Sequence, residues 1–172
     1  MAFDLKLPQL PPSFSDAEVR AAFGSLAPRL LAYLLSFLVL AIMWINHHAL
    51  FDKLRHVTPG LVWHDMALLF VMSLIPLPTH FLATHPLLPV SAMLYGAVMS
   101  LNSLTFLILR RYAESKAGLI PYNPAANRRN RIALGLYILS IPLAGVSVWA
   151  AYLIFIGIPA WYFVPRDTRT AS

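Results

Sequence analysis

Residues 35–48 read Leu35-Ser-Phe-Leu-Val-Leu-Ala-Ile-Met-Trp44-Ile-Asn46-His47-His48. A predominantly apolar segment thus ends in a tryptophan, an asparagine and two adjacent histidines. The interior of a bilayer offers no water to such groups, so polar side chains at that depth usually face protein partners or a water-filled path. The stretch therefore predicts a membrane helix whose end makes specific polar contacts.

The composition of the chain is that of an integral membrane protein. Of its 172 residues, 59% are hydrophobic and 12% are charged, with a mean hydropathy of +0.67. Soluble domains carry about 25% charged residues. The sequence contains no cysteine, which excludes a disulfide framework and thiolate chemistry.

Three long stretches, residues 30–51, 66–109 and 132–165, contain no Asp, Glu, Lys or Arg. Because one crossing takes about 20 residues, the second and third stretches are long enough for two helices each. Pro86 and Pro89 mark one break, and Gly145-Val-Ser147 marks the other. We expect an all-α membrane protein, a bundle of five transmembrane helices at about residues 28–51, 63–82, 88–110, 130–145 and 147–165. One long span or a re-entrant segment is the alternative for residues 132–165.

The distribution of positive charge orients these spans. Ten of the 13 Lys and Arg residues fall in the loop after His48, in the 110–131 loop and in the C-terminal tail. Five crossings place all three segments on one side. Positively charged loops usually face the cytoplasm, so we expect a multi-pass protein of the cell membrane with a cytoplasmic C-terminus. No groove-reading motif accompanies the charge, so we expect no nucleic-acid partner.

The N-terminal segment is expected on the other side of the membrane. Residues 1–15 contain Asp4 and three prolines and lack the apolar core of a signal peptide. Ser15-Asp-Ala-Glu18 fits a capping box that opens a short helix. We expect residues 1–172 to form a single membrane domain that begins with an extracytoplasmic segment, residues 1–27.

Trp44, Asn46, His47 and His48 are the main candidate site residues. Interfacial anchoring is one interpretation, because Trp favours the headgroup region. The favoured one is a structural polar network, because Asn and His form hydrogen bonds between membrane helices. A haem or metal site is the third interpretation. Adjacent histidines lack a ligand spacing of the H-E-x-x-H kind, so we expect no metal and no cofactor.

Two further groups of residues bear on the shape of the bundle. Ser73-Leu-Ile-Pro76-Leu-Pro78-Thr79 predicts a helix kink at Pro76 and Pro78, where a neighbouring Ser or Thr satisfies the freed carbonyl. The kink is either static or a hinge. A small polar set is expected to hold helices together: Ser100, Asn102, Ser103 and Thr105. No G-x-S-x-G, H-E-x-x-H or phosphate-binding glycine loop occurs, so an enzyme is not expected.

These residues resemble the transmembrane protein 175 family of potassium-permeable channels. The resemblance is carried by Tyr33-Leu-Leu-Ser-Phe-Leu with Trp44-Ile-Asn-His-His48, and by Ser73-Leu-Ile-Pro-Leu-Pro-Thr79. It continues through Arg110-Arg-Tyr112 and Ile141-Pro-Leu with Val148-Trp149, and covers about residues 28–169. The resemblance implies a cation channel in which four six-helix chains surround one pore, with cytoplasmic termini.

The sequence departs from the family at its start. The family signature, an Arg followed by Phe-Ser-Asp, opens a first helix whose apolar side chains line the pore. Here Phe14-Ser15-Asp16 has no preceding Arg, and residues 1–8 are similar to the exit of that first helix. We therefore expect helices two to six only, pore-lining residues on a missing upstream helix, and partners for His47 and His48 there.

The resemblance thus implies a subunit of a potassium-permeable channel with passive ion conduction, and it leaves open whether this truncated form conducts. Its expected partners are potassium ions, the lipid bilayer and three further copies in a homotetramer. A non-conducting structural or partner-binding membrane protein is the alternative. A haem- or metal-binding membrane protein is the less favoured one.

Overall fold

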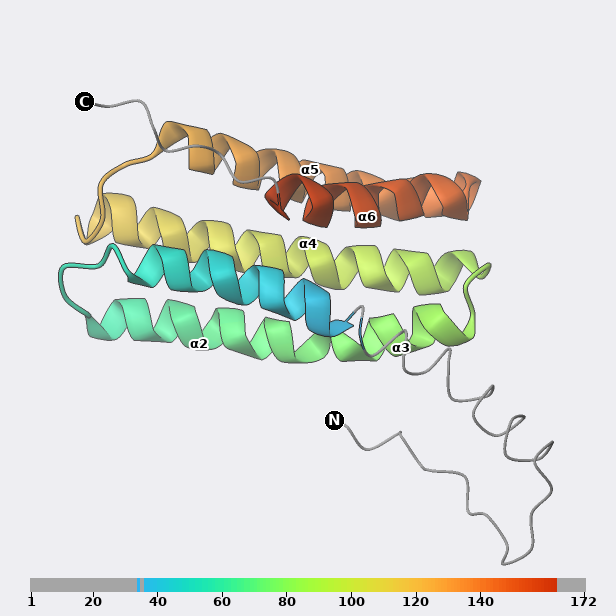
Figure 1. Ribbon diagram of the computed structural model, residues 1–172, viewed down its shortest axis with the longest axis horizontal. Helices are drawn as coiled ribbons and strands as arrows, with labels where there is room; N and C mark the ends of the chain where they lie inside the picture. The colour runs from blue at the N-terminus through green and yellow to red at the C-terminus, as the bar shows by residue number, and fades with distance from the viewer. Residues whose placement is uncertain (1–33, 35, 164–172) are drawn as a thin grey trace, which may run out of the picture.

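The computed structural model describes residues 34 and 36–163, and these form helices and no strand (Figure 1). The elements follow one another as the helix Ser36–Phe51, α2 (Pro59–Leu74), α3 (Pro76–Thr84), α4 (Pro89–Arg111), the short π-helix η1 (Tyr112–Lys116), α5 (Pro124–Val146) and α6 (Val148–Phe163). The expected all-helical bundle is thereby confirmed. The predicted N-terminal segment, residues 1–27, lies outside the described residues.

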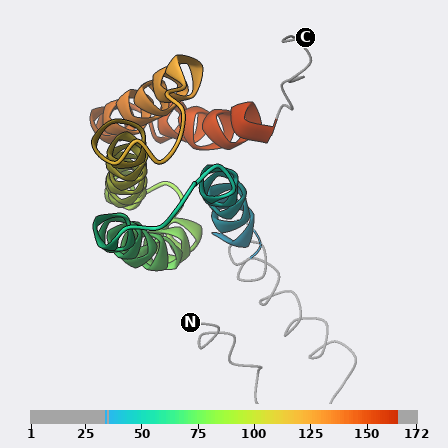
Figure 2. The ribbon, with the colours of Figure 1, turned by 90° about the vertical axis from the view of Figure 1, so that its left-hand side faces the viewer.

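Most of the helices run along a common axis, to which α6 is inclined, and together they form a curved row (Figure 2). Viewed end-on, α6, α5, α4 and the α2–α3 pair follow one another, and the helix Ser36–Phe51 lies beside α2 (Figure 2). The position of α4 is central because it contacts α2, α3, α5 and α6. Along the direction of the helices, the connection at residues 85–88 and the one at Ser147 lie at one end of the bundle, and the loops rich in arginine lie at the opposite end (Figure 1).

Two helices begin earlier than the expected spans, which started near residues 63 and 130. Thr58 caps α2, since its Oγ1 accepts a hydrogen bond from the Leu61 backbone N at 3.3 Å. Asn123 caps α5 in the same way, with Oδ1 3.0 Å from the Ala126 N. A proline follows each cap at the first helical position, where its missing N–H costs nothing. Caps and prolines set these helix starts, whereas the expected bounds followed apolar content.

The last apolar stretch forms two helices. Ser147 has an extended backbone, with φ −154° and ψ 116°, which separates α5 from α6. The two helices pack against each other as a hairpin. As a result, the start of α5 and the end of α6 lie at the same end of the molecule.

Pro76 and Pro78 lie where α2 gives way to α3. Pro76 has no N–H to donate to the Met72 carbonyl, and that carbonyl instead accepts from the Ile75 N at 3.2 Å. Thr79 Oγ1 donates to the Ile75 carbonyl, and Ser73 Oγ to the Phe70 carbonyl. The carbonyl freed by Pro76 is therefore satisfied by a tighter backbone turn, not by the Ser or Thr side chain that we expected.

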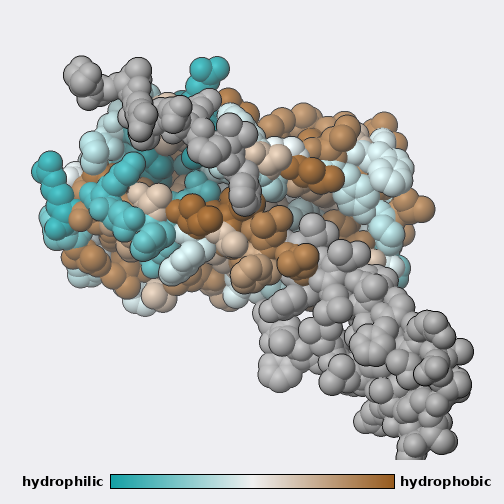
Figure 3. All heavy atoms as spheres, in the orientation of Figure 1, coloured by the Kyte–Doolittle hydropathy of each residue, from teal (hydrophilic) through white to brown (hydrophobic). Residues whose placement is uncertain are grey.

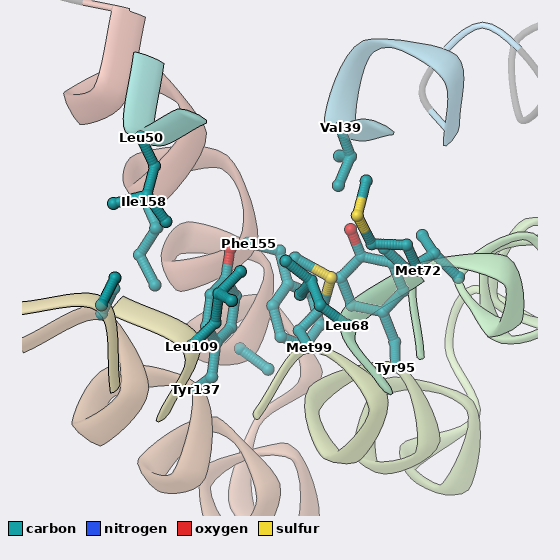
Figure 4. Close-up of a cluster of buried hydrophobic side chains, with 14 of the residues drawn as sticks. Val39, Leu50, Leu68, Met72, Tyr95, Met99, Leu109, Tyr137, Phe155 and Ile158 are labelled. Atoms are coloured by element: carbon teal, nitrogen blue, oxygen red, sulfur yellow. The ribbon is translucent and has the colours of Figure 1, made fainter. Parts of the chain in front are cut away.

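A continuous apolar core joins the helices (Figure 4). Its members come from all five long helical segments, and examples are listed by element: Val39 and Leu50 of the helix Ser36–Phe51, Leu68 and Met72 of α2, Tyr95 and Met99 of α4, Tyr137 of α5, and Phe155 and Ile158 of α6. Tyr95 and Phe155 meet with ring centroids 4.6 Å apart, a geometry favoured by aromatic pairs. The core thus ties the end helices of the row to α4.

The outer surface of the described bundle is also strongly apolar (Figure 3). Large exposed side chains include Trp63, Phe70, Trp149 and Leu153. Two continuous helical segments, Pro59–Thr84 and Pro89–Ser115, are long and apolar enough to cross a bilayer, and the apolar helices Ser36–Phe51 and Val148–Tyr162 are shorter. Hydrophilic side chains gather at the end where α4 ends and α5 begins (Figure 3). Apolar helices of this kind are typical of a membrane protein.

Gly96 allows α4 and α5 to approach closely. A Cβ atom at this position would lie 2.5 Å from Ser140 Oγ and 3.3 Å from Ile141 Cγ1. Ser140 is completely buried and donates to the Tyr137 carbonyl at 2.6 Å. Small residues at such contacts are a main source of helix association in membranes, because they bring backbones together.

We expect Gly96→Ala to lower the free energy of unfolding by about 1–3 kcal/mol, the usual cost of overpacking. The matched control is Gly135→Ala on α5, where the added methyl group has no neighbour within 4 Å. That control should leave stability unchanged or raise it slightly, since Ala is the better helix former. Unfolding titrations in detergent would measure both, and equal effects of the two changes would contradict the close α4–α5 contact.

Candidate functional site: polar contacts at one end of the bundle

His47 forms the closest polar contact between two apolar helices. Its Nε2 lies 2.6 Å from Oδ1 of Asp65 on α2, and the two side chains are 9% and 15% exposed. The Phe51 ring stacks on the imidazole with centroids 4.3 Å apart. Few interactions satisfy an acid within an apolar helix, so this contact fixes the rotation of the helix Ser36–Phe51 against α2.

Asn46 points to a different neighbour, because adjacent residues on a helix are turned by about 100°. Its Nδ2 donates to the Ile42 carbonyl at 2.8 Å, and its Oδ1 accepts from Nη2 of Arg129 on α5 at 3.4 Å. The Arg129 guanidinium also lies over the Tyr162 ring, 4.2 Å from its centroid. The Tyr162 hydroxyl donates to Asn130 Oδ1 at 2.8 Å. One cluster thus links the helix Ser36–Phe51, α5 and α6.

The other two predicted site residues lie on the surface. Trp44 is 55% exposed, and its ring lies 5.5 Å from that of His47 and 6.2 Å from that of His48. The His48 side chain is 64% exposed and stands 3.6 Å from Asp52. An exposed pair of this kind contributes little to stability. The structure therefore separates the motif into an inward pair, Asn46 and His47, and an outward pair, Trp44 and His48.

The partners of the inward pair are found within the described residues. We expected partners for His47 and His48 on an upstream helix, and within the described residues His47 contacts Asp65 and Asn46 contacts Arg129. Asp65 was not among the predicted site residues. Its position directly before a long uncharged stretch was the available signal, because an acid beside an apolar run usually has a partner. The separation of Asn46 from Arg129 by 83 residues left no local signal for that contact.

A small cavity lies beside this cluster. Its volume is about 20 Å³, and it is lined by nine residues: Met43, Asn46, Ser103, Phe106, Asn130, Ala133, Tyr137, Ile158 and Tyr162. The Tyr137 hydroxyl and Asn130 Nδ2 are buried without a hydrogen-bond partner among the described residues. This space suits a single water molecule and is far too small for a haem.

Within the part of the chain that the structure describes, the small polar residues Ser100, Asn102, Ser103 and Thr105 of α4 make one hydrogen bond to another helix. Asn102 is completely buried, and its Nδ2 lies 3.2 Å from Sδ of Met43. Ser100 and Thr105 donate to carbonyls of their own helix, those of Gly96 and Leu101. We expected all four residues to hold helices together, and among the described residues Asn102 is the one that forms a hydrogen bond with another helix. Ser and Thr more readily return to the preceding turn of their own helix.

Glu114 organises the loop between α4 and α5, a role that the sequence analysis missed. Its side chain is 2% exposed and accepts from Arg110 Nε at 3.0 Å and from the Asn123 backbone N at 3.3 Å. It also accepts from Asn127 Nδ2. Gly118, with φ 56°, then turns the chain so that Leu119 N reaches the Ala113 carbonyl at 2.8 Å. Only glycine adopts that φ without strain.

The described histidines do not converge on a metal-binding geometry. His64 Nδ1 lies 2.7 Å from the Gly60 carbonyl, and its ring stacks on Tyr112 with centroids 4.5 Å apart. Among the residues that the structure describes, no three His, Asp or Glu side chains lie close enough together to hold a metal ion. The polar contacts in this part of the chain therefore join helices.

The adjacent histidines provide a direct test of the inward contact. We expect His47→Ala to lower the free energy of unfolding by about 1–3 kcal/mol, because it leaves the Asp65 carboxylate buried without its partner. His48→Ala, the matched control, should change stability by less than about 0.5 kcal/mol, as is usual for exposed sites. Unfolding titrations of both variants in detergent would measure the difference. A double variant with Asp65→Asn should show clear non-additivity with His47→Ala, and simple additivity would refute the contact.

A second test concerns Glu114. Replacing it with Gln removes the charge from three donor contacts and turns an amide group toward them, so we expect a loss of about 1–3 kcal/mol in unfolding free energy. Asp52→Asn is the control, since Asp52 is exposed and pairs only weakly with His48. Thermal unfolding followed by circular dichroism would compare them. A Glu114→Gln variant as stable as the control would rule out the organising role of this carboxylate.

Comparisons with known proteins place the chain in a family. A family model described as "Endosomal/lysosomal potassium channel TMEM175" matches residues 1–76. A potassium channel of Chryseobacterium sp. is 30% identical over 109 residues, which are 63% of this chain and 53% of that protein. One of Chamaesiphon minutus is 29% identical over 134 residues, 73% of this chain and 66% of that protein. The match thus spans less than two thirds of the length of these two relatives.

Two further matches cover a larger share of the matched proteins. A potassium channel of Streptomyces collinus is 34% identical over 186 aligned positions, covering all of this chain and 88% of that protein. The crystal structure of a lysosomal potassium-selective channel TMEM175 homolog from Chamaesiphon minutus superposes with a TM-score of 0.69 and 25% identity, over 85% of this chain and 78% of that one. Taken with the helical fold described above, these matches show that the chain belongs to the TMEM175 family.

Proposed function

We propose that this protein is a subunit of a potassium-permeable channel that conducts passively across the cell membrane. The observation that carries the proposal is the match to the Streptomyces collinus potassium channel, which covers the whole of this chain at 34% identity. The structural match to the TMEM175 homolog supports it, because it extends over 85% of the chain. Channel function needs no catalytic residue or cofactor, in keeping with polar contacts that serve to join helices.

We propose a homotetramer with the C-terminus in the cytoplasm. A single row of helices encloses no pore by itself (Figure 2), and apolar side chains remain exposed on both outer helices of the row, for example Phe37 and Leu153. The excess of positive charge in the 110–131 loop supports the orientation. In such an assembly the contacts of Asn46 and His47 would hold each subunit rigid, while the ion passes between subunits.

The polar contacts favour a pore that is gated by apolar side chains. His47 and Asp65 contact each other, and Asn46 forms hydrogen bonds with Ile42 and Arg129, so these side chains are already engaged within the subunit. An apolar constriction controls conduction through the cost of removing water from the ion. We propose that the side chains lining the pore are residues other than those that form the helix contacts described above.

Flux through liposomes tests the proposal. We expect vesicles containing the purified chain to release potassium down its gradient, followed by a fluorescent dye that reports the compensating proton uptake through an added protonophore. Empty vesicles should stay tight until a potassium ionophore is added. Absence of flux from a folded, incorporated protein, in vesicles whose gradient the ionophore then reveals, would contradict the channel function of this chain.

The two histidine variants serve as matched controls for the flux measurement. His48→Ala should conduct like the unchanged protein, because its side chain lies on the surface. His47→Ala should conduct less per incorporated subunit, because it loosens the helix Ser36–Phe51 from α2. Equal flux from all three proteins would show that conduction does not depend on this helix contact.

A further inference from the structure

A second cavity opens at the end of the α5–α6 hairpin. It has a volume of about 190 Å³ and is lined by Ala125, Arg128, Arg129 and Ile132 of α5 and by Trp161 of α6. Sites for drug-sized ligands measure about 300–1,000 Å³. This cavity is therefore suited to a small charged group, with the remainder of its ligand outside.

The two arginines give the cavity a strong positive charge. Three ion pairs are formed by the described residues, His47–Asp65, His48–Asp52 and Arg110–Glu114, and none of them involves Arg128 or Arg129. Arg129 uses Nη2 to reach Asn46, and its Nε is buried without a partner among the described residues. A guanidinium has five N–H donors, so both side chains retain donors for an anion.

The other side of the cavity is apolar. Ile132 is 39% exposed, and Trp161 stands near the end of α6, the helix that packs antiparallel to α5. Ala125 completes this side. Tryptophan favours the boundary between headgroups and hydrocarbon, and from here the exposed apolar surface of α5 continues to Leu139, which lies two turns beyond Ile132 on the same face. An acyl chain would follow that surface.

We propose that this cavity binds the phosphate of an anionic phospholipid. Arg128 and Arg129 hold the phosphate through charge-assisted hydrogen bonds, and Trp161 and Ile132 contact the glycerol and the upper acyl chain. Basic pockets between membrane helices are known to select acidic headgroups in this manner. The neutral headgroup of phosphatidylcholine carries a bulky cation that two arginines repel, so the site discriminates by charge.

Arg128 and Arg131 provide a matched pair of variants. Both side chains are exposed on α5, but only Arg128 lines the cavity, and its side chain forms no ion pair with another described residue. Arg128→Gln and Arg131→Gln therefore change the net charge equally and differ in their distance from the cavity. Unfolding curves for the two variants should coincide with that of the unchanged protein, which confirms that the fold is retained.

Native mass spectrometry of the detergent-solubilised protein would measure lipid binding. We expect phosphatidylglycerol to remain bound while phosphatidylcholine with the same acyl chains dissociates. Arg128→Gln should require about tenfold more phosphatidylglycerol for equal occupancy, the factor carried by one charge-assisted hydrogen bond. Arg131→Gln should shift the curve by less than about threefold. Equal shifts for the two variants would mean a diffuse charge effect and would overturn the proposal, as would equal retention of the two lipids.

A competition arm distinguishes a lipid from a free anion. Inorganic phosphate, added in large excess over phosphatidylglycerol, should leave the lipid bound, because it lacks the apolar contacts to Trp161 and Ile132. Displacement of the lipid at comparable concentrations of phosphate would show that the site takes a soluble anion, and the lipid proposal would then be wrong.

Discussion

The contact between His47 and Asp65 is the constraint on which the arrangement of the helices depends. An apolar helix can rotate against another with little change in buried area, because every face offers similar side chains. One partly buried carboxylate, that of Asp65, restricts this rotation because His47 is its partner. Once His47 is fixed on α2, Asn46 turns toward α5 and meets Arg129, whose guanidinium lies on Tyr162 of α6. Two adjacent residues thereby set the helix Ser36–Phe51 against both halves of the row.

The sequence predicted the helices better than their contacts. The uncharged stretches and the breaks at Pro86–Pro89 and at Ser147 follow from local rules, since prolines and apolar runs act on their own surroundings. The starts of α2 and α5 were missed because a cap and a proline set them, several residues before the apolar run begins. The pairing of Asn46 with Arg129 joins residues 83 positions apart. Nothing in the local pattern distinguishes Arg129 from Arg128 or Arg131, and only the packed fold does so.

Charge is unevenly balanced along the bundle. At the end where α4 meets α5, the buried carboxylate of Glu114 is fully occupied by Arg110, Asn123 and Asn127. That arrangement orders the loop, but the Glu114 carboxylate forms an ion pair with only one described arginine, Arg110. The neighbouring arginines of α5 are then left to interact with aromatic rings, amides or anions from outside. A loop organised by one buried acid and surrounded by several arginines therefore serves two purposes, since it is rigid inside and positively charged outside.

The match to the TMEM175 homolog combines 25% sequence identity with a TM-score of 0.69. A fold withstands that degree of substitution when few positions carry strict geometric demands. Side chains that face lipid need only be apolar, so Leu, Ile, Val and Phe exchange there at little cost. Demands are strict where a methyl group would collide, as at Gly96, or where a buried polar atom has one partner, as at His47 and Asn102. In this chain such positions occur on α4 and on the helix Ser36–Phe51, where they constrain how these helices pack against their neighbours, while side chains that face lipid are free to vary.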